Sequence, residues 1–274
     1  MCAFVVRFCT VIPRVLTIAG SDCSGGAGIQ ADLKTFSALG VYGGAVITAL
    51  TAQNNTGVFA THQVPADFIG AQIDAVFADL AIGAVKIGML GNAAAIDAVA
   101  AGLDRHGTRN VVLDPVMVAS TGADLLQADA IGALRTVITR ASVVTPNLFE
   151  AAALLGSPLA HNEAEMQAQA QKLLVFGAGA VLLKGGHAGG TESVDLLVEP
   201  DGVARFTAPR VATKRTHGTG CTLSSAIAAG LAKGLSLNAA VREAKAYISA
   251  AIAAGDRLAV GSGRGPVHHF HQWW

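Results

Sequence analysis

Charged and aromatic residues are both scarce in this chain of 274 residues. Charged side chains make up 14% and aromatic side chains 5%, and 19 basic residues balance 19 acidic ones. Binding to nucleic acid or to an anionic membrane needs an excess of basic side chains, so neither partner is expected. Cysteine is also rare: Cys2, Cys9, Cys23 and Cys221 show neither C-x-x-C spacing nor the density of a disulfide scaffold. This pattern favours a reduced protein of the cytoplasm.

The longest stretch without charge, residues 35–66, would be long enough to span a membrane. It is interrupted by glycines, threonines and the run Gln53-Asn54-Asn55, so a buried strand followed by a site loop explains it better than a lipid-facing helix. The apolar start of the chain is broken by Arg7 and has no small-residue cleavage site, so no signal peptide is expected. We expect an N-terminal extension, residues 1–14, followed by a single domain, residues 15–274.

Several familiar enzyme signatures are missing. Residues 26–31 match the G-x-G-x-x-A of dinucleotide-binding proteins, but that motif needs an acidic residue ~20 positions later. No acidic residue occurs between Asp32 and Asp67, which disfavours a Rossmann dehydrogenase. No Gly-Lys pair occurs anywhere, which excludes a P-loop enzyme. The G-x-S-x-G and H-E-x-x-H motifs are missing as well.

Apolar runs of strand length alternate with segments of helical periodicity along the whole chain. The predicted strands are residues 15–19, 45–51, 84–87, 111–113, 142–144, 180–183, 193–198 and 203–206. The predicted helices are residues 29–39, 66–80, 93–106, 128–138, a short segment after Pro146, 163–176, 222–233 and 237–258. This alternation predicts an α/β fold with a mostly parallel central sheet and helices on both faces.

Glycines and polar residues follow most of the predicted strands. In parallel α/β sheets, ligands bind outside the carboxyl ends of the strands, so we expect these residues to converge on one rim. They are Gly20-Ser21-Asp22, Gln53-Asn54, Gly88-Met89, Asp114-Pro115, Thr145-Pro146-Asn147 and Lys184-Gly185-Gly186.

A glycine-rich segment, residues 216–220, is a loop by composition and precedes a helix of small residues that starts at Thr222. Such a loop leaves backbone N–H groups unpaired at the positive end of the helix dipole, where an anion can bind. A plain flexible turn with a threonine N-cap is the alternative. Together with Asp114, Glu150 and Lys184 at strand exits, the loop favours phosphoryl transfer, whose loose transition state needs positioning and charge neutralisation.

A set of motifs spread over the chain carries a specific resemblance. The stretches are TIAGSDCSGGAGIQADLKTFSALG, TALTAQNNTGV, KIGMLG, LDPVM, VTPNLFEA, LLKGGH and THGTGCTLSSAIAAGLA, with the tail GPVHHFHQWW. In these stretches, from residue 15 to residue 274, the chain resembles the hydroxymethylpyrimidine/phosphomethylpyrimidine kinases of thiamine biosynthesis. The resemblance implies a ribokinase-like three-layer fold, ATP and Mg²⁺ as cofactors, and hydroxymethylpyrimidine and its monophosphate as successive substrates. We also expect a homodimer.

The resemblance further implies roles for individual residues. The pyrimidine pocket would contain Gly20, Asp32, Gln53, Met89 and Val116. The anion hole would contain Gly218, Thr219 and Gly220, with Cys221 where ribokinases carry an aspartate base. The nucleotide side would contain Asp114, Thr145, Asn147 and Lys184, and Glu150 would complete with Asn147 the N-x-x-E element that organises Mg²⁺. Within the pocket, the carboxamide of Gln53 would read the aminopyrimidine edge, because it offers a donor and an acceptor together.

Some of these residues also admit a purely structural interpretation. Asp32 could be a first-turn carboxylate stabilised by the helix dipole, and Met89 could be a core residue. Cys221 could be an inert buried thiol, although at a helix N-terminus its pKa is expected to fall. The histidines of the tail could suggest a metal site, but no second ligand set completes one, so a packed tail is favoured. For the function itself, a pyridoxal-type kinase and a non-catalytic module that binds a vitamin precursor are the alternatives.

Overall fold

One mixed β-sheet runs through the computed structural model, which describes residues 11–118, 122, 125–127, 130–186 and 190–274. Within these residues nine strands follow the order β3-β2-β1-β4-β5-β6-β7-β8-β9. The strands are β1 (Arg14–Asp22), β2 (Tyr42–Asn54), β3 (Gly57–Gln63), β4 (Ala84–Ile87), β5 (Val111–Leu113), β6 (Val143–Val144), β7 (Val181–Lys184), β8 (Glu192–Glu199) and β9 (Gly202–Pro209). The neighbouring strands β2, β1, β4, β5, β6 and β7 pair in parallel, whereas β3, β8 and β9 pair antiparallel at the two edges. The predicted mostly parallel sheet is confirmed.

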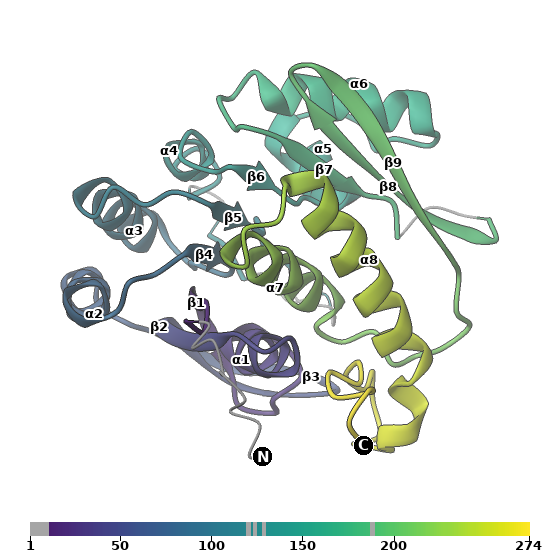
Figure 1. Cartoon of the computed structure of the whole chain (residues 1–274), viewed down its shortest axis with the longest axis horizontal. Helices are drawn as coiled ribbons and strands as arrows, with labels where there is room; N and C mark the ends of the chain where they lie inside the picture. Colours follow the sequence, from purple (N-terminus) through teal and green to yellow (C-terminus); the bar gives the residue numbers. More distant parts are fainter. Residues whose placement is uncertain (1–10, 119–121, 123–124, 128–129, 187–189) are drawn as a thin grey trace, which may run out of the picture.

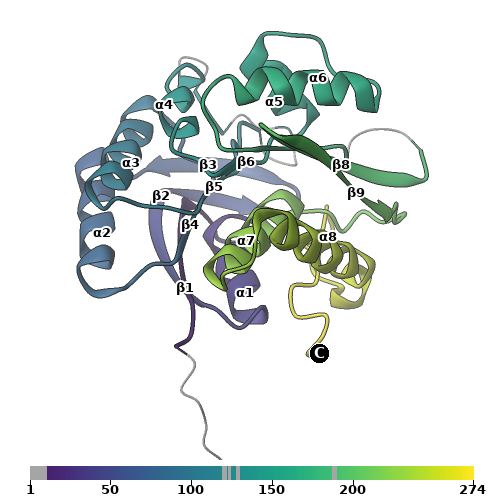
Figure 2. The ribbon, with the colours of Figure 1, turned by 45° about the horizontal axis from the view of Figure 1, so that its top comes forward.

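Helices cover both faces of this sheet, as Figures 1 and 2 show. They are α1 (Gly28–Ala38), α2 (Ala66–Asp79), α3 (Ala93–Arg105), α4 (Leu134–Ile138), α5 (Leu148–Leu155), α6 (Glu163–Leu174), α7 (Thr219–Ala232) and α8 (Leu237–Ala253). One hydrophobic core joins the sheet to α2–α6, with Ile69 and Leu173 among its residues. A second joins the opposite face to α1, α7 and α8, with Phe36 and Ile227. The predicted three layers are confirmed.

The central strands consist almost entirely of small and β-branched apolar residues. β4 and β5 are fully buried runs of Ala, Val, Ile and Leu, as expected for strands that helices cover on both faces. Lys86 in β4 is the exception, because its side chain is also fully buried. A charged residue in the middle of the sheet needs a partner, and that partner belongs to the site described below.

The main differences from the predicted elements have local causes. The sequence does not predict β3, because most of its residues are exposed and no alternation marks a buried face. Helix α4 is much shorter than the predicted segment 128–138, since Gly132 disfavours a helix there and residues 128 and 129 lie outside the described residues. Helix α8 ends before Gly255, and a 3₁₀-helix, Gly255–Leu258, follows.

The first strand begins at Arg14, one residue before the predicted strand 15–19. Residues 1–10 of the predicted extension lie outside the described residues. The uncharged stretch 35–66 forms the end of α1 and the strands β2 and β3, so its interpretation as sheet is confirmed. None of the helices in the described part of the chain combines the length and apolarity needed to cross a membrane.

The C-terminal segment, residues 264–267, forms hydrogen bonds with two loops that belong to the site described below. His217, just before α7, donates its backbone N–H to the Gly265 carbonyl, and its own carbonyl accepts from Val267. Arg264 donates its backbone N–H to the carbonyl of Asn55, in the turn between β2 and β3. The segment therefore ties the β2–β3 turn to the loop that enters α7.

Candidate active site

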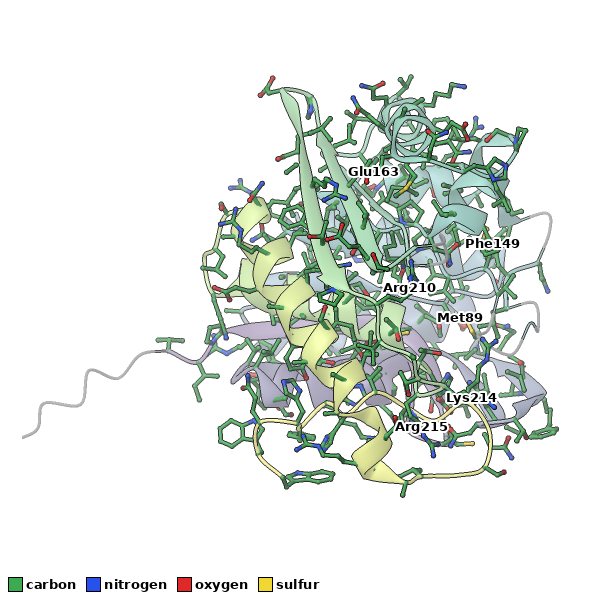
Figure 3. The ribbon with its side chains drawn as sticks, turned by 90° about the vertical axis from the view of Figure 1, so that its right-hand side faces the viewer. Met89, Phe149, Glu163, Arg210, Lys214 and Arg215 are labelled. Carbon is green, nitrogen blue, oxygen red and sulfur yellow. The ribbon has the colours of Figure 1, made fainter. Side chains whose placement is uncertain are left out.

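A cavity of about 1140 Å³ lies at the carboxyl ends of the parallel strands. The predicted site residues that line it are Gly20, Gln53, Met89, Asp114, Val116, Asn147, Glu150, Lys184, Gly218, Thr219, Gly220 and Cys221. In Figure 3, the lining residues Met89, Phe149, Arg210 and Lys214, from separate segments of the chain, all lie along one side of the molecule. The predicted convergence of the strand exits is confirmed. Asp32 and Thr145 do not line the cavity.

The N-terminus of α7 opens into this cavity. The helix begins at Thr219, three residues earlier than predicted, and Gly218 is its N-cap with a left-handed φ of 77°. A Cβ at Gly218 would clash with the carbonyl of Gly26, so both the φ and the close approach require glycine. Thr219 donates its hydroxyl to the Thr216 carbonyl, and no side chain caps the helix. The alternative of a threonine N-cap is therefore wrong, and the first-turn backbone N–H groups of α7 face a cavity suited to an anion.

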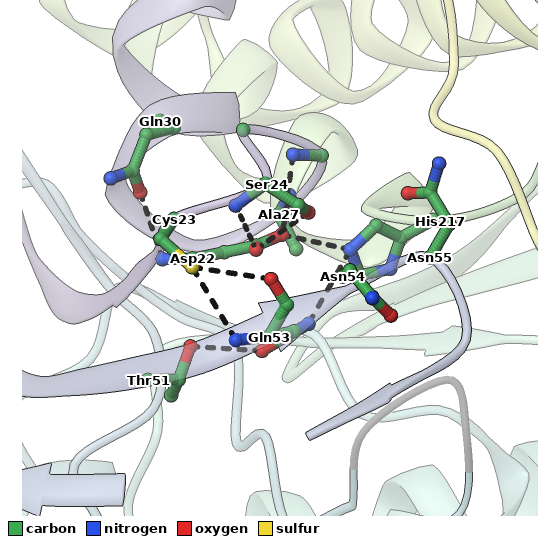
Figure 4. A network of polar contacts seen from close by, with 12 residues as sticks. Asp22, Cys23, Ser24, Ala27, Gln30, Thr51, Gln53, Asn54, Asn55 and His217 are labelled. Carbon is green, nitrogen blue, oxygen red and sulfur yellow. Dashed lines mark hydrogen bonds and ion pairs between the residues drawn. The ribbon is translucent and has the colours of Figure 1, made fainter. Parts of the chain in front are cut away.

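A buried polar network joins the loop after β1 to the loop before α7 (Figure 4). Asp22 Oδ2 accepts from His217 Nε2 at 2.8 Å and from the backbone of Ala27 at 2.8 Å, while Oδ1 accepts the Ser24 backbone N–H at 2.9 Å and its hydroxyl at 2.7 Å. Burial raises the pKa of Asp22, but these donors outweigh it and the pKa lies below its usual range. The network fixes both glycine loops relative to each other.

Gln53 reaches the same network from the end of β2. Its Nε2 lies 3.4 Å from His217 Nε2, and its Oε1 lies 3.1 Å from the Thr51 hydroxyl. The exposed Cys23 contacts the Gln53 backbone through its Sγ, 3.2 Å from the carbonyl oxygen. The carboxamide is thereby held at the cavity wall with donor and acceptor capacity left for a ligand.

Asp32 is held by a buried hydrogen-bond network. It is fully buried, and its carboxylate accepts from Lys86 Nζ at 2.9 and 2.8 Å, from the Thr17 hydroxyl at 2.6 Å and from the Ser225 hydroxyl at 2.7 Å. These donors occupy the carboxylate, and Asp32 does not line the cavity, so its contact with a substrate stays a prediction. The dipole interpretation is wrong, because α1 begins at Gly28 and no acidic residue lies in its first turn. Lys86, the ion-pair partner of Asp32, does line the cavity.

The pKa of Cys221 is shifted in the opposite direction to the expectation. Burial raises it to about 11, and the nearby Asp32 and Asp114 carboxylates raise it as well. The charge of Lys86 and the backbone N–H of Gly28 lower it, but less than the others raise it. Desolvation thus outweighs the helix N-terminus, and the thiol of the unliganded protein keeps its proton at neutral pH.

Lys184, Asp114 and Glu150 form a second charged group, at the exits of β7, β5 and β6. Lys184 Nζ lies 2.7 Å from Asp114 Oδ1 and 4.0 Å from Glu150 Oε2. Thr145 is fully buried below Asp114, with its hydroxyl 3.2 Å from Asp114 Oδ1. Thr145 does not line the cavity and supports Asp114, so its place on the nucleotide side stays a prediction.

Asn147 and Glu150 form the N-terminal capping box of α5. The Asn147 side chain accepts from the Glu150 backbone at 2.9 Å, and Glu150 Oε2 accepts from the Asn147 backbone at 2.7 Å. The pKa of Glu150 is raised to about 7, mainly by burial; Lys184 opposes this shift and Asp114 adds to it. An added cation would stabilise the ionised form of Glu150.

The donor set fits Mg²⁺ held mainly through water. Among the described residues, no group of three or more His, Cys, Asp or Glu side chains could hold a metal ion by itself. Mg²⁺ commonly takes one or two protein carboxylates and fills its shell with water and substrate phosphates. Asp114 and Glu150 line the cavity and offer that number of carboxylates.

The histidine-rich tail is packed against the domain. His269 is buried, with Nε2 3.1 Å from the Thr222 hydroxyl of α7, and burial lowers its pKa to about 3. Tyr247 of α8 donates its hydroxyl to the His269 carbonyl at 2.7 Å. The interpretation as a packed tail is confirmed for this histidine.

Sequence reasoning assigned no role to three residues that organise the site: Asp22, Lys86 and His217. Each lies inside one of the stretches that carry the family resemblance. The stretches therefore predict the location of the site, although they do not predict the role of these residues. Sequence reasoning also missed Lys245 of α8, whose Nζ lies 2.7 Å from Asp195 Oδ2 at the far end of the cavity. No local pattern reveals such pairs, because the partners of these residues come from distant segments.

Comparisons with known proteins agree with the motifs. The family model described as phosphomethylpyrimidine kinase matches residues 22–268. A hydroxymethylpyrimidine/phosphomethylpyrimidine kinase of Rhizobium meliloti is 59% identical over 94% of this chain and 97% of the relative, and that of Salmonella typhimurium is 56% identical over 95% and 98%. The crystal structure of a phosphomethylpyrimidine kinase from Clostridium difficile is 44% identical, with a TM-score of 0.78 over 88% of this chain and 99% of that one. An ADP complex of a Bacillus subtilis pyridoxal kinase is 36% identical, with a TM-score of 0.88 over 95% and 98%.

Proposed function

The chain belongs to the phosphomethylpyrimidine kinase family, and we propose that it phosphorylates 4-amino-5-hydroxymethyl-2-methylpyrimidine and then its monophosphate in thiamine biosynthesis. ATP is the phosphoryl donor, in keeping with the ADP complexes of related kinases. The observation that carries this proposal is the uncapped N-terminus of α7, which opens into the same cavity as Gln53 and Lys184. One cavity thus contains an anion hole, the Gln53 carboxamide, which can pair with a ring edge, and the Lys184 ammonium, which can bind phosphate. This combination suits a kinase of a small heteroaromatic alcohol.

The acceptor side of the cavity would hold the pyrimidine. Gln53 would pair with the aminopyrimidine edge, and Gly20, Met89 and Val116 would line the ring. A Cβ at Gly20 would lie 2.9 Å from the Met89 methyl group, so this wall has no room for a larger residue at position 20. A tight, apolar slot with one carboxamide suits a flat ring with a polar edge.

The first phosphorylation needs a base, because the acceptor alcohol loses its proton as its oxygen attacks the γ-phosphorus. We assign this role to the thiolate of Cys221, which is the minor form of this side chain at neutral pH. The backbone N–H groups of Gly218, Thr219 and Gly220 would stabilise the charge that accumulates on the phosphoryl oxygens. The monophosphate already carries an anionic oxygen near neutral pH, so the second phosphorylation needs no base.

The nucleotide side would hold the phosphates of ATP. Lys184 would neutralise phosphate oxygens, and Asn147 would contact the nucleotide. Asp114, Asn147 and Glu150 would position Mg²⁺ and its water ligands. When bound, Mg²⁺ neutralises phosphate charge and orients the transferred group. Lys184 would then exchange part of its contact with Asp114 for the phosphate.

Kinetics with three acceptors tests the proposal. The purified protein with ATP should convert hydroxymethylpyrimidine to its monophosphate and then to the diphosphate. Chromatography of the products measures both steps. Pyridoxal should have a lower kcat/KM than either pyrimidine. Phosphorylation of pyridoxal alone would instead identify a pyridoxal kinase. Binding of the pyrimidine with no ADP released from any acceptor would identify a non-catalytic binding module.

The proposed location is the cytoplasm, where ATP is available and where free thiols such as Cys221 stay reduced. The proposed assembly is a homodimer. Light scattering coupled to gel filtration measures the mass of the particle in solution, and a mass equal to a single chain would overturn the dimer.

A further inference from the structure

Gln53 holds its carboxamide between two polar groups of the cavity wall (Figure 4). One end of the carboxamide lies 3.4 Å from His217 Nε2, and the other end lies 3.1 Å from the Thr51 hydroxyl. A carboxamide accepts hydrogen bonds through its oxygen and donates them through its NH₂ group. The two ends have nearly the same size, so the hydrogen-bonding partners decide which end faces which side.

The histidine side of the carboxamide needs the oxygen. His217 Nε2 lies 2.8 Å from Asp22 Oδ2. Burial raises the pKa of the Asp22 carboxyl, but its hydrogen bonds to His217 and Ser24 hold the pKa below its usual range, so the ionised carboxylate can only accept. His217 Nε2 therefore carries a proton, whether the imidazole is neutral or charged. An NH₂ group beside it would set a donor against a donor, whereas the carboxamide oxygen can accept from the same N–H.

The threonine side of the carboxamide needs the NH₂ group. Thr51 Oγ lies 2.9 Å from the backbone carbonyl oxygen of Ser21, closer than it lies to Gln53. A hydroxyl has one proton and a carbonyl oxygen can only accept, so the shorter contact uses that proton. The Thr51 oxygen is then left as an acceptor, which pairs with an NH₂ group and not with a second oxygen. The two sides thus favour the same direction of the carboxamide independently.

We propose that His217, held by Asp22, is a positioning residue that turns the Gln53 carboxamide with its oxygen toward the imidazole and its NH₂ group toward Thr51. This rests on the proposed function, because it concerns how the same pocket binds the aminopyrimidine. In this direction the contacts of His217 with Asp22 and Gln53, and those of Thr51 with Ser21 and Gln53, each pair a donor with an acceptor. The carboxamide keeps one lone pair and one N–H for a ligand.

The direction of the carboxamide decides how the substrate ring lies. A carboxamide pairs with an amino group and the neighbouring ring nitrogen together, as it does with adenine. The oxygen of Gln53 would accept from the 4-amino group and its NH₂ group would donate to N3, so the amino group lies toward His217 and N3 toward Thr51. The 5-hydroxymethyl group is next to the amino group and away from N3, so it lies on the His217 side. His217 directly precedes Gly218, the N-cap of α7, so the reactive alcohol faces the loop that leads to the anion hole.

A pyrimidine with the opposite hydrogen-bonding pattern tests the proposal. In the 4-oxo counterpart of the substrate, an acceptor oxygen replaces the amino group and N3 carries a proton. Isothermal titration calorimetry without ATP measures the dissociation constant of each ring. Wild-type protein should prefer the amino ring, because the fixed carboxamide sets its oxygen against the oxo group. His217→Phe keeps a flat ring but removes the N–H and frees the carboxamide to turn, so this preference should fall about three- to tenfold, the worth of one neutral hydrogen bond.

The change in preference separates this role from a purely structural one. Loss of a structural histidine would weaken the binding of both rings by the same factor, so an unchanged preference in His217→Phe would overturn the proposal, as would a wild-type preference for the oxo ring. His269→Phe is the matched control: it also removes a buried histidine, but one whose Nε2 contacts the Thr222 hydroxyl, and it should leave the preference unchanged. If His217→Phe does not fold, Thr51→Val removes the acceptor on the other side with little change of shape. It should lower the preference in the same direction, and an unchanged preference would overturn the proposal.

Nitrogen-15 NMR of the histidine side chains gives a second readout that needs no ligand. His217 is buried, so a proton on its Nε2 is protected from exchange with water and should show a one-bond coupling to that nitrogen. The signal is assigned by its loss in His217→Phe. An Nε2 without a proton would overturn the proposal. If neither ring binds to the wild-type protein, the proposed function fails, and the protonation of Nε2 alone decides the direction of the carboxamide.

Discussion

The two sides of the cavity balance their charges differently. On the acceptor side each buried carboxylate has its own basic partner: Lys86 lies 2.8 Å from Asp32, and His217 lies 2.8 Å from Asp22. On the nucleotide side Lys184 serves two carboxylates, Asp114 at 2.7 Å and Glu150 at 4.0 Å. The acceptor side is therefore complete without a ligand, whereas the nucleotide side has an excess of negative charge and is suited to a cation.

The difference indicates how each side contributes to the reaction. A site whose polar groups are already paired is pre-organised, so it selects a ligand by shape and by the few groups left unpaired, such as the Gln53 carboxamide. A site with an uncompensated carboxylate gains stability only when a cation arrives with its phosphate ligand. The pKa of Glu150, raised to about 7 by burial and by Asp114, is the measurable sign of that excess.

Gly218→Ala should cause the largest effect, because it disturbs both sides at once. A Cβ at this position would clash with the Gly26 carbonyl and would strain a left-handed φ, so the first turn of α7 has to move. Losing one oxyanion donor costs about 10²–10³ in kcat, and displacing several should cost at least about 10³ with both acceptors. Gly234→Ala is the matched control: its φ is 85° but no atom lies within 4 Å, so stability should fall while kcat stays close to wild type. Comparable kcat values for the two variants would contradict the anion hole.

Cys221→Ala should affect the acceptor side and only one of its two reactions. Loss of a positioned base costs about 10²–10⁴, so the single-turnover rate with the alcohol should fall by that factor. The rate with the monophosphate should fall much less, because the backbone anion hole survives. Equal losses would indicate a phospho-cysteine intermediate, and no loss with the alcohol would leave Cys221 a packing residue.

Gln53→Leu should confine its effect to acceptor binding. The substitution keeps most of the volume but leaves the polar edge of the pyrimidine unpaired, at a cost of about 1–3 kcal/mol. The KM for hydroxymethylpyrimidine should therefore rise by about tenfold or more, whereas the KM for ATP should not change. Steady-state kinetics with each substrate varied in turn measures both KM values. An equal rise in the two would contradict the assignment of Gln53 to the pyrimidine pocket.

Glu150 should produce the smallest effect, visible as a pH dependence on the nucleotide side. Its pKa of about 7 means that the carboxylate is mostly protonated at pH 6 and mostly ionised at pH 8. Mg²⁺ favours the ionised form, so the Mg²⁺ concentration for half-maximal activity should fall about tenfold between these values. Glu150→Gln should need more Mg²⁺ and should lose this part of the pH dependence, while the titration of ATP itself is common to both proteins. Identical Mg²⁺ titrations of the two proteins would refute the assignment.

Much of the fold follows from local patterns, and the failures have physical causes. Strand β5 matches its predicted bounds because a strand covered on both faces must be an unbroken apolar run, and β4 matches as well although Lys86 interrupts its run. The exposed edge strand β3 carries no such pattern. The helix α7 starts three residues early, because its glycines read as loop residues while tertiary contacts with the loop at Gly26 hold them in place.

The sequence by itself determined which segments meet, because residues that follow parallel strands must share one edge of the sheet. Tertiary structure alone decided what those residues do to one another. Asp32 and Lys86 are 54 positions apart, and Asp22 and His217 are 195 apart, so no periodicity or spacing predicts that they pair. The ionisation of Cys221 was decided in the same way. The sequence reveals a helix N-terminus, which lowers the pKa of a thiol. Only the fold creates burial beside two carboxylates, and these raise the pKa of Cys221 by more than the helix lowers it.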